Sequence, residues 1–212
     1  MNSPKAVILS ALKPIHGKLR TQKINAFLSI VNATCGTATL LDVGGGPGIT
    51  GEFLPLYARF QDVVVVNLQP QHMPQVDGVR IRAMIGDGRA LPFERGAFDW
   101  VFSNAVIEHV GKYEDQILFA SEIRRVASRG YFVACPNRYF PLEPHSLLPF
   151  FQFLPAALQK RIAPYSPGYL STYEEINLLS PSQLQRLFPE AHVRAVGFPI
   201  LGNSIIASYR KE

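Results

Sequence analysis

The stretch Leu41-Asp42-Val43-Gly44-Gly45-Gly46-Pro47-Gly48-Ile49-Thr50 decides the fold of this 212-residue chain. It joins a short apolar run to a segment with helical spacing, and four glycines lie between the two. Glycine permits positive φ and the close approach of a ligand, and the N-terminus of a helix offers unpaired N–H groups. The stretch therefore predicts a nucleotide-like ligand bound between a strand and a helix.

Apolar runs of strand length alternate with helical segments along the chain, which indicates a parallel sheet covered by helices. A further helix begins with Ser180 as N-cap and Pro181 at its first position. Strands are predicted at 39–43, 63–66, 81–85, 98–103, 130–135, 193–198 and 204–209, and helices at 49–60 and 113–127. These elements predict a single α/β domain over residues 1–212.

Two segments fall outside this alternation. Residues 1–34 are predicted to form an N-terminal helical extension, with Phe27 and Val31 on one apolar face. Residues 136–173 hold 7 of the 17 prolines and 8 of the 23 aromatic residues, and Glu143 is their only acid. We expect them to form an ordered insert or lid after the fifth strand.

The net charge of +5 (21 basic minus 16 acidic residues) is unevenly distributed. Residues 1–41 hold five basic residues and no acid. Their apolar stretch 6–12 is followed by a lysine and a proline, which does not fit a secretory signal. The apolar run 147–158 is shorter than the roughly 20 residues that span a bilayer. We therefore predict a cytoplasmic protein.

The chain has only two cysteines, Cys35 and Cys135, and they lie a hundred residues apart. This usage fits two reduced thiols in a cytoplasmic protein. We expect neither a disulfide nor a zinc site, and no residue is predicted to bind a metal.

Two nucleotide-binding patterns overlap in the glycine loop. Residues 46–51 form a literal G-x-G-x-x-G, the dinucleotide fingerprint, but it starts three residues after the strand and has a proline at its second position. The pattern acid-x-Gly-x-Gly-x-Gly instead fits Asp42, Gly44, Gly46 and Gly48, with the acid at the strand end. This second pattern resembles motif I of class I S-adenosylmethionine-dependent methyltransferases.

Two further stretches extend the resemblance. Residues 86–93 (GDGRALPF) and 97–110 (AFDWVFSNAVIEHV) are similar to the family's G-D-A-x-x-L-P-F and F-D-x-V-x-S-x-x-V-I-E-H-V stretches. The resemblance to the class covers about residues 36–135 and 180–210. Residues 136–145 (PNRYFPLEPH) are similar to a stretch of bacterial members that act on small molecules or envelope components, which implies the small-molecule, ubiquinone-biosynthesis-like type. The resemblance to the class implies a Rossmann-like, seven-stranded, mostly parallel sheet with helices on both faces, and S-adenosylmethionine as the cofactor.

The resemblance also implies roles for individual residues. The backbone of Gly44 and Gly46 is expected beside the methionine part of the cofactor, with Asp42 organising the loop. Asp87 is expected to accept a hydrogen bond from the adenine amino group. The other predicted cofactor-binding residues follow the second strand, frame the adenine or line the sulfonium end: Asn67, Leu68, Gly88, Arg89, Ser103 and Asn104.

Asn67 departs from the family pattern, which has an acid here that binds both ribose hydroxyls. An amide accepts with one end and donates with the other, so weaker cofactor binding is expected. The departure supports the alternative of a non-catalytic relative that binds the cofactor or a partner protein. It also counts against NAD, which favours an acid at the same place.

Methyl transfer needs an oriented nucleophile, and a hydroxyl acceptor also gains from a general base. The candidates for that base are His145, Glu143, Tyr139 and His109. In the alternative interpretation, Glu143 pairs with Arg138, His145 caps the following turn, and His109 is structural.

The run 147–154 is too apolar to be left in water unless it packs on the core or meets a partner. With Lys160, Arg161 and the basic N-terminus, it favours a small-molecule or lipid-like acceptor, such as an envelope precursor, and a peripheral membrane contact through 147–161. A nucleic-acid acceptor is the alternative for a chain of pI 9.3. It is disfavoured because the basic residues are not interleaved with exposed aromatics in a binding module.

Overall fold

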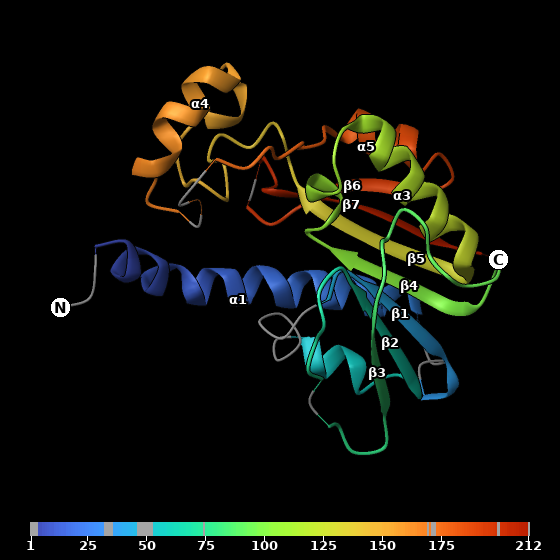
Figure 1. Cartoon of the computed structure of the whole chain (residues 1–212). Coiled ribbons are helices and arrows are strands. Elements are labelled where there is room, and N and C mark those ends of the chain that lie inside the picture. The colour runs from blue at the N-terminus through green and yellow to red at the C-terminus, as the bar shows by residue number, and fades with distance from the viewer. Residues whose placement is uncertain are drawn as a thin grey trace.

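The computed structural model describes residues 4–31, 36–45, 53–73, 75–168, 170, 173–198 and 200–211. Its centre is a seven-stranded sheet with the strand order β3-β2-β1-β4-β5-β7-β6 (Figure 1). The strands are β1 (Thr39–Val43), β2 (Asp62–Asn67), β3 (Arg80–Ile85), β4 (Phe98–Asn104), β5 (Ala127–Pro136), β6 (His192–Val196) and β7 (Ser204–Arg210). The first five strands are parallel, and β7 pairs antiparallel with β5 and β6. The predicted Rossmann-like α/β fold is confirmed.

The sheet order places the ends of β1, β2 and β4 beside one another. Asp42 of β1 is in register with Val65 of β2 on one side and with Phe102 of β4 on the other. The strand order runs outward in opposite directions from β1 and β4. Open parallel sheets bind their ligands outside the carboxyl ends of the strands at such a reversal.

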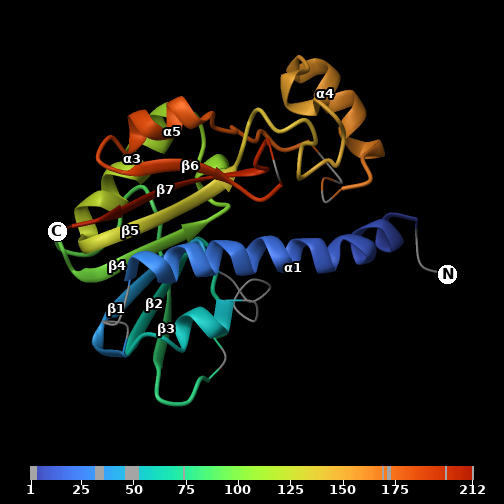
Figure 2. The ribbon, with the colours of Figure 1, turned by 180° about the vertical axis from the view of Figure 1, so that it is seen from behind.

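Helices cover both faces of the sheet, as predicted (Figures 1 and 2). On one face, α3 (Tyr113–Val126) and α5 (Pro181–Leu187) bury Phe119 and Leu184. On the other face lie α1 (Pro4–Val31) and the helical residues 53–57. The β-branched run of β2 is therefore buried from both sides, which explains its continuous apolar sequence.

The helix α5 begins where the sequence predicts. Ser180 is its N-cap, and its hydroxyl accepts a hydrogen bond from the Gln183 N–H at 3.2 Å. The Gln183 side chain accepts in return from the Ser180 N–H at 2.9 Å, which completes a capping box.

The helix α1 belongs to the core only in its second half. Phe27 and Val31 are fully buried, and the Phe27 ring lies 5.3 Å from that of Phe102 and 5.4 Å from that of Phe132. The first half projects beyond the sheet and carries the exposed Val7 (Figures 1 and 2). The described side chains of α1 that belong to the core, among them Phe27 and Val31, all lie in its second half.

The insert after β5 holds η3 (Phe151–Phe153), α4 (Ala156–Ile162) and η4 (Ala163–Tyr165). It has a small apolar cluster of its own, built on Phe151, Ala163 and Leu170. The insert projects from the same side of the sheet as the first half of α1 (Figures 1 and 2).

Within the described part of the chain, no helix combines the length and the apolar character that a membrane span requires. Cys135 is buried in β5 and is not in a disulfide, while Cys35 lies outside the described residues.

Candidate cofactor and active site

A cavity of about 440 Å³ opens at the carboxyl ends of β1, β2 and β3. Its volume lies in the range of small-molecule sites. Predicted site residues contribute to its lining: Gly44, Asn67, Leu68, Asp87, Gly88, Arg89 and His109. The structure thus gathers residues from four parts of the sequence around one space.

Two glycines keep this cavity open. Gly44 has φ +88°, and a Cβ there would lie 2.3 Å from Cγ2 of Val106. A Cβ on Gly88 would lie 2.6 Å from the Phe119 ring. Both positions therefore require glycine. Gly46, the other glycine predicted to bind the cofactor, lies outside the described residues.

Asp42 lies beneath the glycine loop and does not line the cavity. It is buried, and its carboxylate accepts a hydrogen bond from the Tyr57 hydroxyl. Burial raises the pKa of Asp42 to about 7, although the bond from Tyr57 opposes the rise. A Cβ on Gly45 would lie 2.7 Å from Oδ2 of Asp42, so the loop backbone passes close to this carboxylate. This position suits the predicted role of Asp42 in organising the loop.

Asn67 acts as a clamp on the glycine loop. Its Nδ2 donates to the carbonyl oxygens of Gly45 at 2.5 Å and Gly44 at 3.3 Å. Its Oδ1 accepts from the N–H of Gln69 at 3.2 Å. An ionised carboxylate cannot donate to the two carbonyls, so the amide gives this loop a contact that an acid would not.

Asp87 is held by an arginine two residues along the chain. Oδ2 of Asp87 lies 2.7 Å from Nη2 and 3.0 Å from Nε of Arg89, and these hydrogen bonds lower the pKa of Asp87. Nη1 of Arg89 also donates to Asp115 at 2.9 Å. The pairing favours the charged form of Asp87 at the cavity wall, and a carboxylate is a strong acceptor for an amino group.

Ser103 and Asn104 take part in other contacts. The buried Ser103 hydroxyl donates to the carbonyl oxygen of Val43 at 2.9 Å and so joins β4 to β1. Oδ1 of Asn104 accepts from Nζ of Lys23 at 3.0 Å, which ties α1 to the carboxyl end of β4. Neither residue lines the cavity in the described structure, and their place at the sulfonium end stays a prediction.

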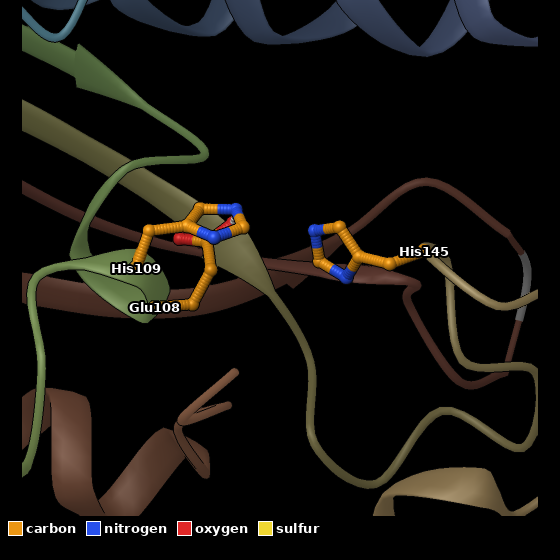
Figure 3. A group of neighbouring side chains, drawn as sticks. All are labelled: Glu108, His109 and His145. Carbon is orange, nitrogen blue, oxygen red and sulfur yellow. Dashed lines mark ion pairs between the residues drawn. The ribbon is translucent and has the colours of Figure 1, made fainter. Parts of the chain in front are cut away.

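A second polar group lies where the 3₁₀ helix η2 (Ile107–His109) meets the insert (Figure 3). Nδ1 of His145 lies 2.6 Å from Oε1 of Glu143, and Glu143 also accepts from the Ser146 N–H at 2.6 Å. Burial opposes the charged form of His145, but the Glu143 carboxylate outweighs it and raises the pKa of His145. The ring of His109 stands perpendicular to that of His145, with centroids 5.0 Å apart.

The structure tests the predicted pairing of Glu143 with Arg138. Its pairing with Arg138 is wrong, because Glu143 is buried and bonds to His145 and Ser146. The Arg138 guanidinium instead lies 5.9 Å from the centre of the Phe153 ring. Tyr139 is 55% exposed and does not line the cofactor cavity. Of the four candidate bases, the structure therefore brings together His145, Glu143 and His109 but not Tyr139.

Two residues near the site were not predicted. Glu108 is fully buried, and this burial raises its pKa to about 7. Lys23 of α1 approaches the same region, and burial of its ammonium group lowers its pKa. The place of Glu108 next to His109 in the sequence could have indicated that Glu108 lies near the site. The contact of Lys23 with Asn104 joins residues 81 positions apart, so no local sequence pattern indicated it.

The strand order and the cavity at the carboxyl edge of the sheet are those of the Rossmann-like methyltransferase fold. Residues 41–135 match the family described as a methyltransferase domain. No curated protein matches the chain in sequence.

Solved structures share the fold over most of the chain. The magnesium protoporphyrin IX methyltransferase of Synechocystis, solved with bound SAH, has a TM-score of 0.65 at 14% identity, covering 100% of this chain and 89% of its own. The PH0226 protein of Pyrococcus horikoshii has a TM-score of 0.61 at 18% identity, covering 91% and 90%. A S-adenosylmethionine-dependent methyltransferase of Methanosarcina mazei has a TM-score of 0.57 at 14% identity, covering 87% and 98%. At these identities the likeness concerns the fold.

Proposed function

We propose that this protein transfers a methyl group from S-adenosylmethionine to a small-molecule or lipid-like acceptor, as a relative of the ubiquinone-biosynthesis-like methyltransferases. One observation carries the proposal: the cavity at the carboxyl edge is lined by Gly44, Asp87 and His109, within the stretch that matches the methyltransferase domain.

The residues of the cavity would bind and orient the cofactor. S-adenosylmethionine, when bound, supplies a sulfonium methyl group that a nucleophile can attack in line. The backbone at Gly44 allows close approach, and Asp87 offers a charged acceptor to the adenine amino group. Of the four candidate bases, His145 fits best, because the buried Glu143 fixes its Nδ1 and leaves Nε2 available.

Exposed aromatic and basic side chains of the insert support an amphipathic acceptor. Phe150 and Phe153 of the insert are 58% and 48% exposed. The insert also carries Lys160 and Arg161 on α4, and the projecting half of α1 lies on the same side of the sheet (Figures 1 and 2). Aromatic and basic side chains together suit a lipid headgroup region, so a peripheral membrane contact through 147–161 is part of the proposal.

One observation favours a second candidate, a non-catalytic protein that binds the cofactor or a protein partner. Both ends of the Asn67 side chain are already bonded within the chain, so the usual acidic partner of the ribose hydroxyls is replaced by a structural clamp. Turnover on any acceptor would exclude this candidate.

Cofactor choice is tested by calorimetric titration of the tag-free protein with S-adenosylmethionine, with S-adenosylhomocysteine and with NAD. We expect one molecule of either sulfur compound to bind per chain and NAD not to bind. Binding of NAD alone would overturn the proposal.

Acceptor class is tested with methyl-labelled S-adenosylmethionine and three acceptor pools: a total lipid extract, a water-soluble small-molecule extract and total RNA. We expect label in the lipid or small-molecule pool. Label confined to RNA would contradict the proposed acceptor, and cofactor binding without transfer to any pool would favour the non-catalytic candidate.

A further inference from the structure

We propose that Glu108, His109 and His145 form a binding site for one divalent transition-metal ion, such as Zn²⁺ or Co²⁺. Each of the three residues offers one ligand atom, and these atoms all lie within 4.8 Å of one another. In Figure 3 the two imidazole rings point toward one another, and the Glu108 carboxylate lies beside the ring of His109. Two imidazoles and one carboxylate are a common ligand set for such ions.

The burial of the Glu108 carboxylate is the strongest argument for a bound cation. It is fully buried, and neither carboxylate oxygen has a hydrogen-bond partner among the described residues. The nearest ring nitrogen of His109, Nε2, is 4.0 Å from Oε1 of Glu108, beyond hydrogen-bond distance. An unpartnered buried carboxylate costs free energy, and a bound cation would compensate it directly.

The surroundings of His145 are those of a metal ligand. Its Nδ1 is bonded to the buried Glu143, which fixes the ring, and the other ring nitrogen, Nε2, points toward His109 (Figure 3). Metal-bound histidines commonly have this carboxylate partner on the second nitrogen. In the metal-loaded protein His145 would be a ligand, and the role of base proposed above would belong to the metal-free protein.

The backbone that carries Glu108 and His109 is also fixed. The side-chain amide of Gln116, which is buried in α3, donates to the carbonyl oxygens of Ile107 at 3.1 Å and Asn177 at 2.8 Å. The Asn177 N–H donates to the carbonyl oxygen of Glu108 at 2.9 Å. Two other segments of the chain, at Gln116 and at Asn177, therefore hold η2 in place.

The three ligand atoms must move closer together to bind one ion. Ligand atoms at about 2.0–2.1 Å from a tetrahedral ion lie about 3.3 Å apart, so the three side chains must close by rotation of their outer bonds. Three protein ligands leave a position open for water or another small oxygen ligand. Because His109 also lines the cofactor cavity, the ion would lie at the edge of that cavity.

The site is tested by titrating chelator-treated, tag-free protein with Co²⁺ and with Zn²⁺, without S-adenosylmethionine. We expect one ion per chain and the visible absorption band of Co²⁺ bound by nitrogen and oxygen. Glu143→Gln should weaken binding roughly 10–100-fold as an outer partner, and Glu108→Gln and His145→Ala by at least that factor as direct ligands. His192→Ala, at an exposed histidine of β6, is the matched control and should bind as wild type does.

Thermal unfolding of each metal-free variant separates loss of a ligand from loss of the fold. Glu108→Gln keeps the size of the side chain and removes an unpaired buried carboxylate, so it should unfold no more easily than wild type. If His145→Ala does not fold, Glu108→Gln decides the question. Absence of stoichiometric Co²⁺ binding by wild type, or equal binding by Glu108→Gln, would overturn the proposal. Either result would leave the proposed methyl transfer untouched, because its tests measure cofactor binding and label transfer and do not depend on metal binding.

Discussion

Asp42 combines burial with a titratable group beneath the glycine loop. Its only described side-chain partner is the Tyr57 hydroxyl, and burial raises its pKa to about 7. The carboxyl of an unfolded chain titrates near pKa 3.9. Between these two values the folded state holds a proton that the unfolded state has released, so stability must fall as pH rises.

We therefore predict that the free energy of unfolding of the cofactor-free protein declines from about pH 4 to about pH 7 and then levels off. Glu108, whose pKa burial also raises to about 7, contributes to the same decline. Asp42→Asn can still accept from Tyr57 and should remove the part of the decline that Asp42 causes, so its stability relative to wild type increases with pH. Urea denaturation at about pH 5 and about pH 8 measures the difference. Parallel behaviour of variant and wild type would show that Asp42 stays ionised throughout.

Asp87 is the carboxylate expected to recognise the cofactor. Asp87→Ala should weaken S-adenosylhomocysteine binding by about 1–3 kcal/mol, the cost of losing a hydrogen bond to a charged group. Arg89 would keep its bond to Asp115, so the cavity wall should persist. Calorimetry measures the change, with Asp77→Ala at an exposed position as control. An unchanged dissociation constant for Asp87→Ala would remove this residue from the site.

Part of the site could be predicted residue by residue. Gly44 and Asp87 stand in motifs whose spacing fixes their place at the ends of strands, and both line the cavity. The roles of Glu143 and Asn67 depend on tertiary contacts: Glu143 turns to His145 rather than Arg138, and Asn67 turns to the loop. No local pattern distinguishes such alternatives, because each partner is chemically suitable.

Among the elements, α1 packs on the core through Ile24, Phe27 and Val31, and Phe27 makes its aromatic contacts. Phe27 is fully buried among Phe60, Trp100, Phe102 and Phe132, with ring centroids 5.3 to 6.1 Å away. This packing makes the second half of α1 a layer of the fold.

Phe27→Ala should accordingly lower the free energy of unfolding by about 3–5 kcal/mol, the usual cost of removing a buried Phe. Val7→Ala, on the exposed half of the same helix, should change it by less than about 0.5 kcal/mol. Urea denaturation compares the two. Equal small effects would mean that α1 does not pack on the sheet in solution.

The elements of the core were predictable because their periodicity reflects burial. The strand predicted at 39–43 is β1, and the helix predicted at 113–127 is α3 apart from its last residue. β5 begins at Ala127, three residues before its predicted start. Its first residues, Ala127-Ser128-Arg129, form no apolar run and pair with β4 across a register shift, so no apolar pattern marks them. The insert contains buried and exposed residues in no regular order, so its composition alone does not predict where its helices lie.

At the scale of the whole molecule, five basic residues, as many as the net charge of +5, lie within α1. Lys5 and Lys13 belong to its first half, which projects on the side of the insert (Figure 1), whereas Lys23 is bonded to Asn104 at the sheet. This arrangement would attract an anionic surface toward the exposed aromatics Phe150 and Phe153.

We predict that the protein sediments with vesicles of phosphatidylglycerol and phosphatidylcholine. Phe150→Ser with Phe153→Ser should reduce this binding by roughly tenfold or more, since burying one Phe is worth roughly 1.5–3 kcal/mol. Phe151 is left unchanged because it is buried in the cluster of the insert. Ile117→Ser, at an exposed apolar position on α3, is the control. Equal sedimentation of all three proteins would exclude the membrane contact.

The central claim is that the cavity between Gly44, Asp87 and His109 holds the cofactor. A crystal structure of the protein grown with S-adenosylhomocysteine tests it most directly. The account predicts density for this molecule in that cavity, with its adenine amino group at Asp87 and its amino-acid part at the glycine loop. Density for the molecule at another place, or an empty cavity in crystals of protein that binds it in solution, would contradict the account.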